Sequence, residues 1–161
     1  MSAPKSPLLI HASCVAWGSH AALLCGPSGS GKSDLALRFL SLGEEAQLVA
    51  DDQVELRAEE NHLFVGAPHA LAGLLEVRGL GLWRVASLPG AEVRLIVNLV
   101  PRDAVPRLPE SRFTALGNVN LPTLSLHAFD ASTPVKLRVA LQTISRMPRE
   151  VSFPGDDGKF S

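Results

Sequence analysis

The stretch CGPSGSGKSDLALRFL, residues 25–40, predicts a phosphate-binding loop followed by a helix. It satisfies the pattern G-x-x-x-x-G-K-[ST], in which glycines let backbone N–H groups converge on phosphate oxygens. The loop residues are Gly26, Pro27, Ser28, Gly29, Ser30, Gly31, Lys32 and Ser33. Lys32 is expected to reach the β and γ phosphates of a nucleotide, and Ser33 to ligate Mg²⁺. Such loops serve hydrolysis, phosphoryl transfer or binding alone, and the loop by itself does not distinguish these activities.

The segments around this loop predict many strands and two helices. Apolar runs at residues 13–18 and 21–26 predict a hairpin that leads into the loop, and the helix after it is expected to reach Leu42 and end at Gly43. Further strands are predicted at residues 46–52, 54–58, 62–67, 93–100 and 121–129, with a strand and tight loop at 74–85. The last helix is expected to have Thr133 as its N-cap and Pro134 at its first position. These elements make a mixed, strand-rich α/β fold.

Length and composition set the limits on function. The 161 residues fit one domain, expected at residues 1–147, with a flexible tail at 148–161. No apolar run approaches a membrane span or a signal-peptide core, and Cys14 and Cys25 lack metal-site spacing, so a cytoplasmic protein with free thiols is expected. The net charge of -1 and 5% aromatic residues argue against nucleic acid as a partner.

Carboxylates near the ends of predicted strands are the candidates for chemistry. Asp51 and Asp52 end the strand at residues 46–52, where the ligand crevice of an open α/β sheet lies. One of them could assist a metal ion and the other act as a base. Glu76 and Arg78 interrupt an apolar run, so we expect them to pair with each other or to meet a metal ion and phosphates.

The five histidines are interpreted mainly as structural residues. His20, His62 and His69 are expected in surface turns or loops. His127 falls in a strand pattern without an obvious partner, and His11 precedes the first strand. No two histidines have the spacing of metal ligands.

Taken together, four features resemble the catalytic domain of HPr kinase/phosphorylase, a family related in fold to phosphoenolpyruvate carboxykinase. The features are His11, the loop at residues 26–33, LVADD at 48–52 and LLEVRGLG at 74–81. The resemblance implies phosphoryl transfer from ATP or pyrophosphate to a serine of HPr, the phosphocarrier of the sugar phosphotransferase system. It also implies the reverse reaction, in which inorganic phosphate removes the phosphoryl group as pyrophosphate. Family members assemble as hexamers, so a homo-oligomer is expected.

The resemblance also assigns roles to individual residues. It implies that Asp51 is the base for the serine proton, that Lys32 stabilises the transferred group, and that His11 approaches the phosphates or Asp51. Ser33, Glu76 and Asp52 would hold Mg²⁺. Ser28 and Arg78 would contact the phosphate or substrate.

The sequence departs from the family pattern in three places. The sequence begins shortly before His11, without the family's N-terminal domain, so a shortened form is expected. The turn before LVADD is two residues longer than usual. HAFDASTPVK stands at residues 127–136, where the family has an arginine-rich RPGRN loop. Arg112 is a possible replacement for a lost arginine.

Two other functions remain open on the sequence. The missing arginine loop would suit a nucleotide-binding regulatory module without catalysis. A small-molecule kinase is the third hypothesis, although no segment is long enough to form a lid over a metabolite.

Overall fold

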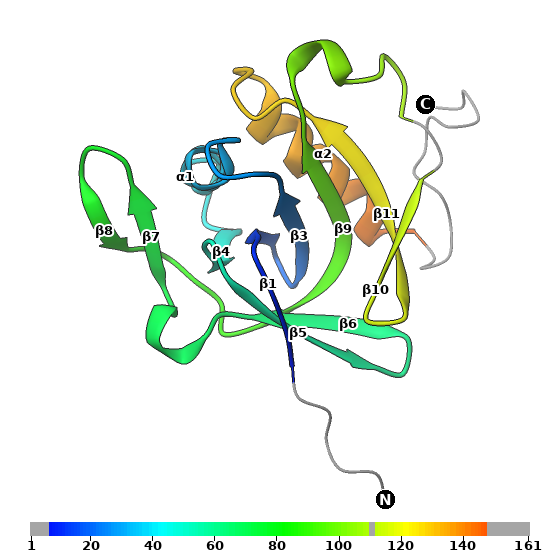
Figure 1. The fold of residues 1–161 in the computed structure, drawn as a ribbon, viewed down its shortest axis with the longest axis horizontal. Coiled ribbons are helices and arrows are strands. Elements are labelled where there is room, and N and C mark those ends of the chain that lie inside the picture. Colours follow the sequence, from blue (N-terminus) through cyan, green and yellow to red (C-terminus); the bar gives the residue numbers. More distant parts are fainter. Residues whose placement is uncertain (1–6, 110–111, 148–161) are drawn as a thin grey trace, which may run out of the picture.

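The computed structural model describes residues 7–109 and 112–147 (Figure 1). The predicted tail at 148–161 lies outside the described residues. The strands are β1 (Leu8–Ile10), β2 (Ser13–Trp17), β3 (His20–Cys25), β4 (Ala46–Ala50), β5 (Val54–Glu59), β6 (His62–Gly66), β7 (Leu74–Val77), β8 (Gly81–Arg84), β9 (Ala91–Leu99), β10 (Phe113–Leu116) and β11 (Val119–Leu126). The helices are α1 (Lys32–Leu40) and α2 (Thr133–Ser145), with single 3-10 turns η1 (His69–Leu71) and η2 (Arg102–Ala104).

The main sheet is organised around β9, which pairs with β3, β6 and β11. Its order is β1-β5-β6-β9-β3-β2-β4, and β11 also pairs with β9 and carries β10. Ile96 of β9 is in register with both Leu23 of β3 and Thr123 of β11, so β3 and β11 lie on opposite edges of β9. Both of these pairings are parallel, whereas β6 joins β9 in the antiparallel direction. The fold is therefore a mixed, strand-rich α/β fold.

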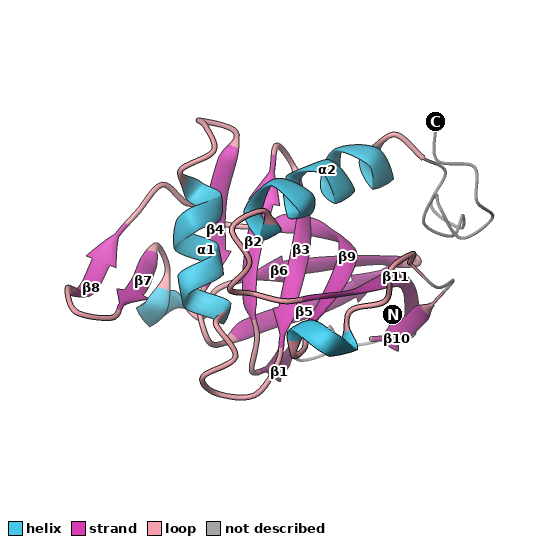
Figure 2. Ribbon diagram, turned by 90° about the horizontal axis from the view of Figure 1, so that it is seen from above, coloured by secondary structure: helices cyan, strands magenta, loops and turns pink. Residues whose placement is uncertain are grey.

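Alternate residues of the central strands face two separate cores. On β3, Leu24 packs in the core beneath the helices, while Leu23 packs in the second core formed with β5, β6 and β11. Both helices lie on the same side of the sheet (Figure 2). They bury Leu35, Phe39, Leu137 and Leu141 against it. Strand β9, predicted at residues 93–100, is buried on both faces, because it contributes to both cores.

The helix boundaries differ from the sequence predictions at three positions. Helix α1 ends at Leu40, before the predicted Leu42 and Gly43, because the hydroxyl and amide of Ser41 both bond to the Arg38 carbonyl. The N-cap of α2 is Ser132, so the prediction of Thr133 was wrong. The Thr133 hydroxyl instead donates to the backbone carbonyl of His127.

A small two-stranded sheet, β7 and β8, stands apart from the main sheet (Figure 1). It confirms the predicted strand and tight loop, with Gly79 and Gly81 at φ 91° and 93° in the turn. Apolar side chains of its turn and of β8 are unusually exposed, at 68% for Leu80, 70% for Leu82 and 51% for Trp83, whereas Leu75 of β7 is buried in the core beneath the helices. Within the described residues, no helix is both long and apolar enough to cross a membrane.

The two cysteines are expected to react very differently with thiol reagents. Cys14 is fully buried, and burial raises the pKa of its thiol. Cys25 is half-buried; burial raises its pKa, with Lys32 opposing the change. Because the thiolate is the reactive form, Cys25 should react slowly with a disulfide reagent and Cys14 far more slowly still. The labelling of each thiol is followed over time in the variant that keeps only that cysteine, Cys25→Ser for Cys14 and Cys14→Ser for Cys25. Each variant is measured both native and in denaturant. Rapid native labelling of Cys14 would contradict this assignment.

Candidate functional site

The glycine-rich loop lies between β3 and the start of α1, as the sequence predicts. Gly31 is the N-cap of α1, at φ 97°, and Lys32 is the first helical residue. The N-terminus of this helix therefore faces the loop with free backbone N–H groups, which suit a phosphate. The Ser30 hydroxyl is buried without a hydrogen-bond partner among the described residues. Such an unsatisfied donor fits a loop that awaits a ligand oxygen.

Gly31 is also required by packing, and its replacement should lower stability. A Cβ at this position would lie 2.8 Å from atoms of both Ala128 and Phe129. A Cβ on Gly29, at φ 83°, would meet no atom within 4 Å. Gly29→Ala should therefore cost only backbone strain of about 1–2 kcal/mol, and Gly31→Ala about 1–3 kcal/mol more. Thermal unfolding measures the difference, which should be several degrees. Equal melting temperatures would mean that residues 128–129 move aside freely.

The Lys32 ammonium group is held within the loop. It donates to the carbonyl oxygens of Gly26 at 2.6 Å and Pro27 at 3.0 Å. The flexible lysine stem can exchange these carbonyls for phosphate oxygens, which are stronger acceptors because they are charged. Ser28 and Gly29 are exposed at the tip of the same loop. The structure thus places the predicted phosphate-binding residues together on one turn.

Asp51 connects three segments of the site. Its carboxylate, 8% exposed, follows β4 and accepts two hydroxyl bonds at Oδ1, from Ser33 at 2.7 Å and from Ser13 at 2.8 Å. Oδ2 accepts the backbone N–H of Glu76 at 3.1 Å. The loop, strand β2 and strand β7 therefore meet at one carboxylate. Ser13 was not predicted as a site residue, although a serine within an otherwise apolar strand was a usable signal.

Asp52 and His11 lie beside this centre. Asp52 is exposed and has a positive φ of 68°, and its N–H bonds to the Ser13 hydroxyl at 3.2 Å. Its carbonyl accepts the N–H of Ala12, which puts the neighbouring His11 one residue from the Asp52 backbone. The His11 side chain is exposed. Asp51 is thus the buried member of the pair, and Asp52 is the one open to solvent.

The expectation for Glu76 and Arg78 needs correction. Both residues are exposed, so neither is a buried charge that must find a partner. Among the described residues they form no ion pair with each other, because Glu76 is on β7 and Arg78 is in the hairpin turn. The structure links Glu76 to Asp51 through its backbone only.

Three histidines also differ from the sequence interpretation. His20 and His62 are in strands β3 and β6, and both contact the Glu92 carboxylate, at 3.9 Å and 2.8 Å. Burial and the nearby Arg94 lower the pKa of His20, with Glu92 opposing them. His127 has a partner after all, since its Nδ1 lies 2.9 Å from the Val100 carbonyl. The partners were missed because they are far away in the sequence.

Arginines from other segments hold the loop at residues 127–132, where the arginine-rich motif was expected. Arg38 of α1 donates to the carbonyls of Ala128 and Asp130. Arg102 of η2 pairs with the Asp130 carboxylate at 2.6 Å. Arg112, the possible replacement arginine, lines a cavity next to β11. This loop packs against Gly31, so it forms one wall beside the phosphate-binding loop.

The available donors suit magnesium better than a transition metal. The described residues contain no group of three His, Cys, Asp or Glu side chains that could hold a metal ion. Mg²⁺ does not need such a group, because it uses one or two carboxylates together with phosphate oxygens and waters. Ser33, Asp52 and Glu76 offer only oxygen donors, which is the chemistry that Mg²⁺ prefers.

The family model for the HPr Serine kinase C-terminal domain matches residues 5–107, more than half of the chain. This chain belongs to that family. The match includes the glycine-rich loop, Asp51 and the β7–β8 hairpin, the same segments that meet at the Asp51 carboxylate.

Curated relatives and a solved structure agree with the family assignment. HPr kinase/phosphorylase of Lactobacillus acidophilus is 35% identical over 121 residues, which are 65% of this chain and 35% of the relative. The Bacillus cereus protein of that name is 42% identical over 85 residues, 48% of this chain and 27% of the relative. This chain therefore spans only a minor part of these relatives. The Hpr(Ser) kinase/phosphatase of Coxiella burnetii has the same fold, with a TM-score of 0.74 at 24% identity, covering 84% of this chain and 94% of that chain.

Proposed function

We propose that this chain is the catalytic domain of a protein-serine kinase that transfers the γ-phosphoryl group of ATP to HPr. The observation that carries the proposal is the 2.7 Å bond between the Ser33 hydroxyl and the buried Asp51 carboxylate. It joins the phosphate-binding loop to the buried carboxylate that follows β4, so the candidate base lies next to the hydroxyl that would help to hold Mg²⁺. Membership of the HPr kinase family supports HPr as the acceptor of the phosphoryl group. A nucleotide-binding fold of the phosphoenolpyruvate carboxykinase type is part of this proposal.

The loop residues would bind and orient the nucleotide. The backbone N–H groups at the start of α1, with Ser28 and Lys32, would surround the β and γ phosphates. Lys32 would then neutralise charge that develops on the transferred group. Mg²⁺ bound through Ser33, Asp52 and Glu76 would supply further positive charge to the phosphates. His11 and Arg78 are both exposed, Arg78 in the β7–β8 turn, and they would contact the phosphates or the acceptor.

Asp51 would act as the general base. Its Oδ1 is occupied by two hydroxyl donors, whereas Oδ2 has one backbone donor and retains acceptor capacity. Oδ2 would take the proton of the acceptor serine as the serine oxygen bonds to the γ-phosphorus and the bond to the ADP oxygen breaks. In the reverse reaction an oxygen of inorganic phosphate would bond to the phosphorus of phosphoserine as the bond from that phosphorus to the serine oxygen breaks. The protonated Asp51 would return its proton to the serine oxygen, and pyrophosphate would leave. Since residues 127–132 contain no arginine, we propose that the forward reaction is the stronger one.

The test is phosphotransfer measured in both directions. The purified chain is incubated with Mg²⁺-ATP and a cognate HPr, and phosphoserine is located by mass spectrometry. HPr with its acceptor serine replaced by alanine is the control for the site. Seryl-phosphorylated HPr with inorganic phosphate then tests pyrophosphate release. The absence of phosphoserine on HPr would reject the kinase proposal, and phosphorylation of a metabolite in its place would favour the small-molecule kinase.

The proposal includes self-association and a cytoplasmic location. The exposed Leu80, Leu82 and Trp83 of the β7–β8 hairpin give an apolar surface that a second subunit or HPr could cover. Light scattering on the wild-type chain and on a Leu82→Ser variant measures the assembly. A monomer at all concentrations would remove the oligomer from the proposal and leave the kinase unaffected.

A further inference from the structure

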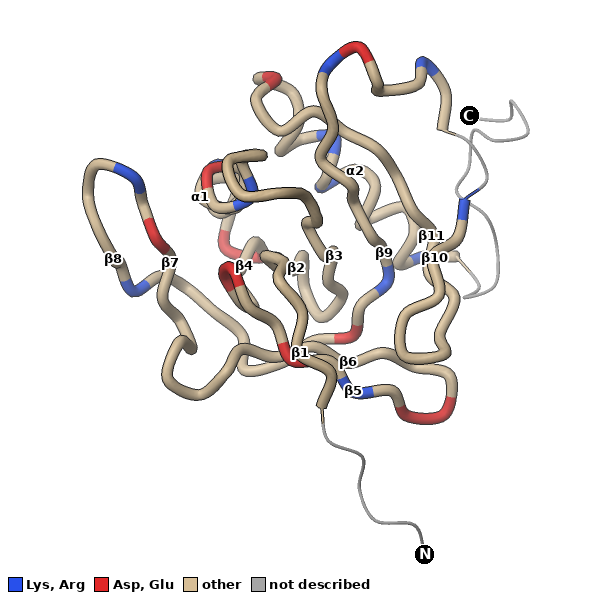
Figure 3. The backbone as a smooth tube through the Cα atoms, in the orientation of Figure 1, with Lys and Arg blue, Asp and Glu red and all other residues tan. Residues whose placement is uncertain are grey.

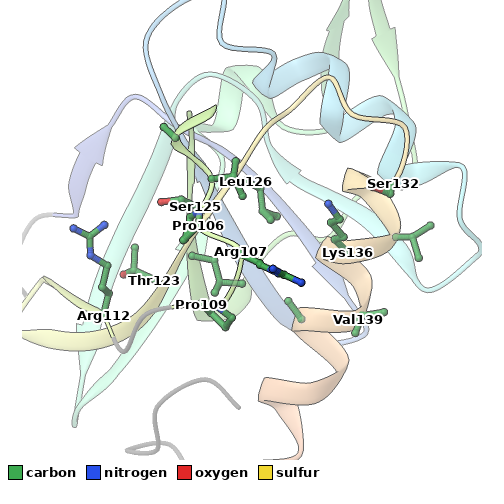
Figure 4. A pocket seen from close by; sticks show the side chains of 15 residues that line it. Pro106, Arg107, Pro109, Arg112, Thr123, Ser125, Leu126, Ser132, Lys136 and Val139 are labelled. Atoms are coloured by element: carbon green, nitrogen blue, oxygen red, sulfur yellow. The ribbon is translucent and has the colours of Figure 1, made fainter. Parts of the chain in front are cut away.

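A cavity away from the glycine-rich loop is the strongest unexplained feature of the molecule. It has a volume of about 540 Å³ and lies between the segment that follows β9, strand β11 and helix α2 (Figure 4). This volume is within the range of small-molecule sites. No residue of the loop at 26–33 lines it.

Basic side chains gather along the cavity. Arg107, Arg112 and Lys136 line it, and its described lining contains no Asp or Glu. Arg107 belongs to the β9–β10 connector, where basic positions recur (Figure 3), and Lys136 belongs to the first turn of α2. Neither Arg107 nor Lys136 forms an ion pair with another described residue. In Figure 4 their charged ends approach the same part of the cavity, while Arg112 lies at its other end.

The rest of the lining combines an apolar wall with hydroxyl groups. Leu124, Leu126 and Val139 provide the apolar surface. Ser125 and Ser132 also line the cavity, and their hydroxyls make no hydrogen bond within the described part of the chain. Ser132 is the N-cap residue of α2, but its hydroxyl makes no capping hydrogen bond, so this hydroxyl can face a ligand beside the positive end of the helix dipole.

We propose that this cavity binds an amphiphilic anion, an apolar or aromatic body that carries a phosphate or carboxylate group. The body would cover the leucine and valine side chains. The charged group would bind between the Arg107 guanidinium and the Lys136 ammonium, where it relieves the repulsion between two cations. The site is distinct from the nucleotide site, because no residue of the loop at 26–33 lines it and β9 lies between β11 and β3.

The experiment titrates the full chain with phenyl phosphate, benzoate and phenol, using calorimetry and backbone amide shifts. Phenyl phosphate or benzoate should shift amides of residues 123–126 and 132–140, and phenol should bind at least tenfold more weakly. Whichever anion binds with the higher affinity shows whether the site prefers a phosphate or a carboxylate group. An Arg107→Gln/Lys136→Gln double variant should lose at least tenfold in affinity. Arg57→Gln, an exposed arginine on β5, is the matched control and should change nothing.

Lys32→Ala separates this site from the phosphate-binding loop. It should leave phenyl phosphate binding at the cavity unchanged, and Mg²⁺-ATP should not displace the ligand. Loss of binding in Lys32→Ala, or displacement by ATP, would assign the anion to the nucleotide site and overturn the proposal. Equal affinity for phenol, full affinity in the double variant, or no saturable binding would overturn it as well.

Discussion

Asp51→Asn is expected to lower the rate of phosphotransfer about a thousandfold, while nucleotide affinity remains nearly unchanged. Asparagine has the shape of aspartate and can still accept the hydroxyl bonds of Ser13 and Ser33 through its amide oxygen. It cannot take a proton from the acceptor serine, so the chemical step is the one that fails. Single-turnover phosphotransfer measures that step, and a fluorescent ATP analogue measures the affinity.

Asp52→Asn is the matched variant, because it changes the neighbouring carboxylate, which is open to solvent. If Asp51 is the base, Asp52→Asn should retain most of the rate at saturating Mg²⁺ and need more Mg²⁺ to reach it. If Asp52→Asn instead lost the transfer rate a thousandfold while Asp51→Asn stayed active, Asp52 would be the base and Asp51 would serve Mg²⁺ binding. Equal loss of nucleotide affinity in both variants would make Asp51 a metal-binding residue and not a base.

Lys32→Ala is expected to lose about a hundredfold in nucleotide affinity and nearly all transfer. The ammonium would make charge-assisted bonds to the phosphates worth about 3 kcal/mol in total, and each 1.4 kcal/mol is tenfold in affinity. The same group holds the Gly26 and Pro27 carbonyls, so the loop itself should also loosen. Calorimetric titration with Mg²⁺-ATP measures the affinity, and Arg57→Ala is the control. Full affinity in Lys32→Ala would show that phosphate binds elsewhere.

The parts of the fold that sequence predicts well depend on neighbouring residues. The hairpin of β5 and β6 is an example, since Glu60 and Asn61 adopt the positive φ angles, 47° and 68°, of a tight turn. The loop at 26–33 and the strand that ends at Asp51 are also local patterns. Strand β10 was missed, although Gly117 and Asn118 have positive φ angles and form the turn to β11. That pair of turn residues was a usable signal.

The site is less predictable where residues distant in the sequence meet. The candidate Asp51 was found because it follows a strand, but its contacts with Ser13 and with the Glu76 backbone depend on how three strands are arranged. The partners of His20 and His62 were hidden for the same reason, since both contact Glu92 of β9. Burial of Glu76 and Arg78 was inferred from apolar neighbours. It was wrong because the β7–β8 hairpin stands outside the main sheet.

The parallel pairing of β3 with β9 has a consequence for folding and for synthesis of the chain. Strand β3 ends at Cys25, and β9 does not begin until Ala91, so the strand that leads into the phosphate-binding loop depends on a partner much later in the chain. Bringing together two strands so far apart in the sequence is slow, because the entropic cost of closing the intervening loop comes before the stabilising contacts form. A nascent chain that stops before β9 would expose the unpaired edge of β3 and the parts of both cores that β9, β11 and α2 cover. The domain should therefore form the glycine-rich loop and the contacts of Asp51 in one late, cooperative step, and before that step the chain would be most dependent on chaperones.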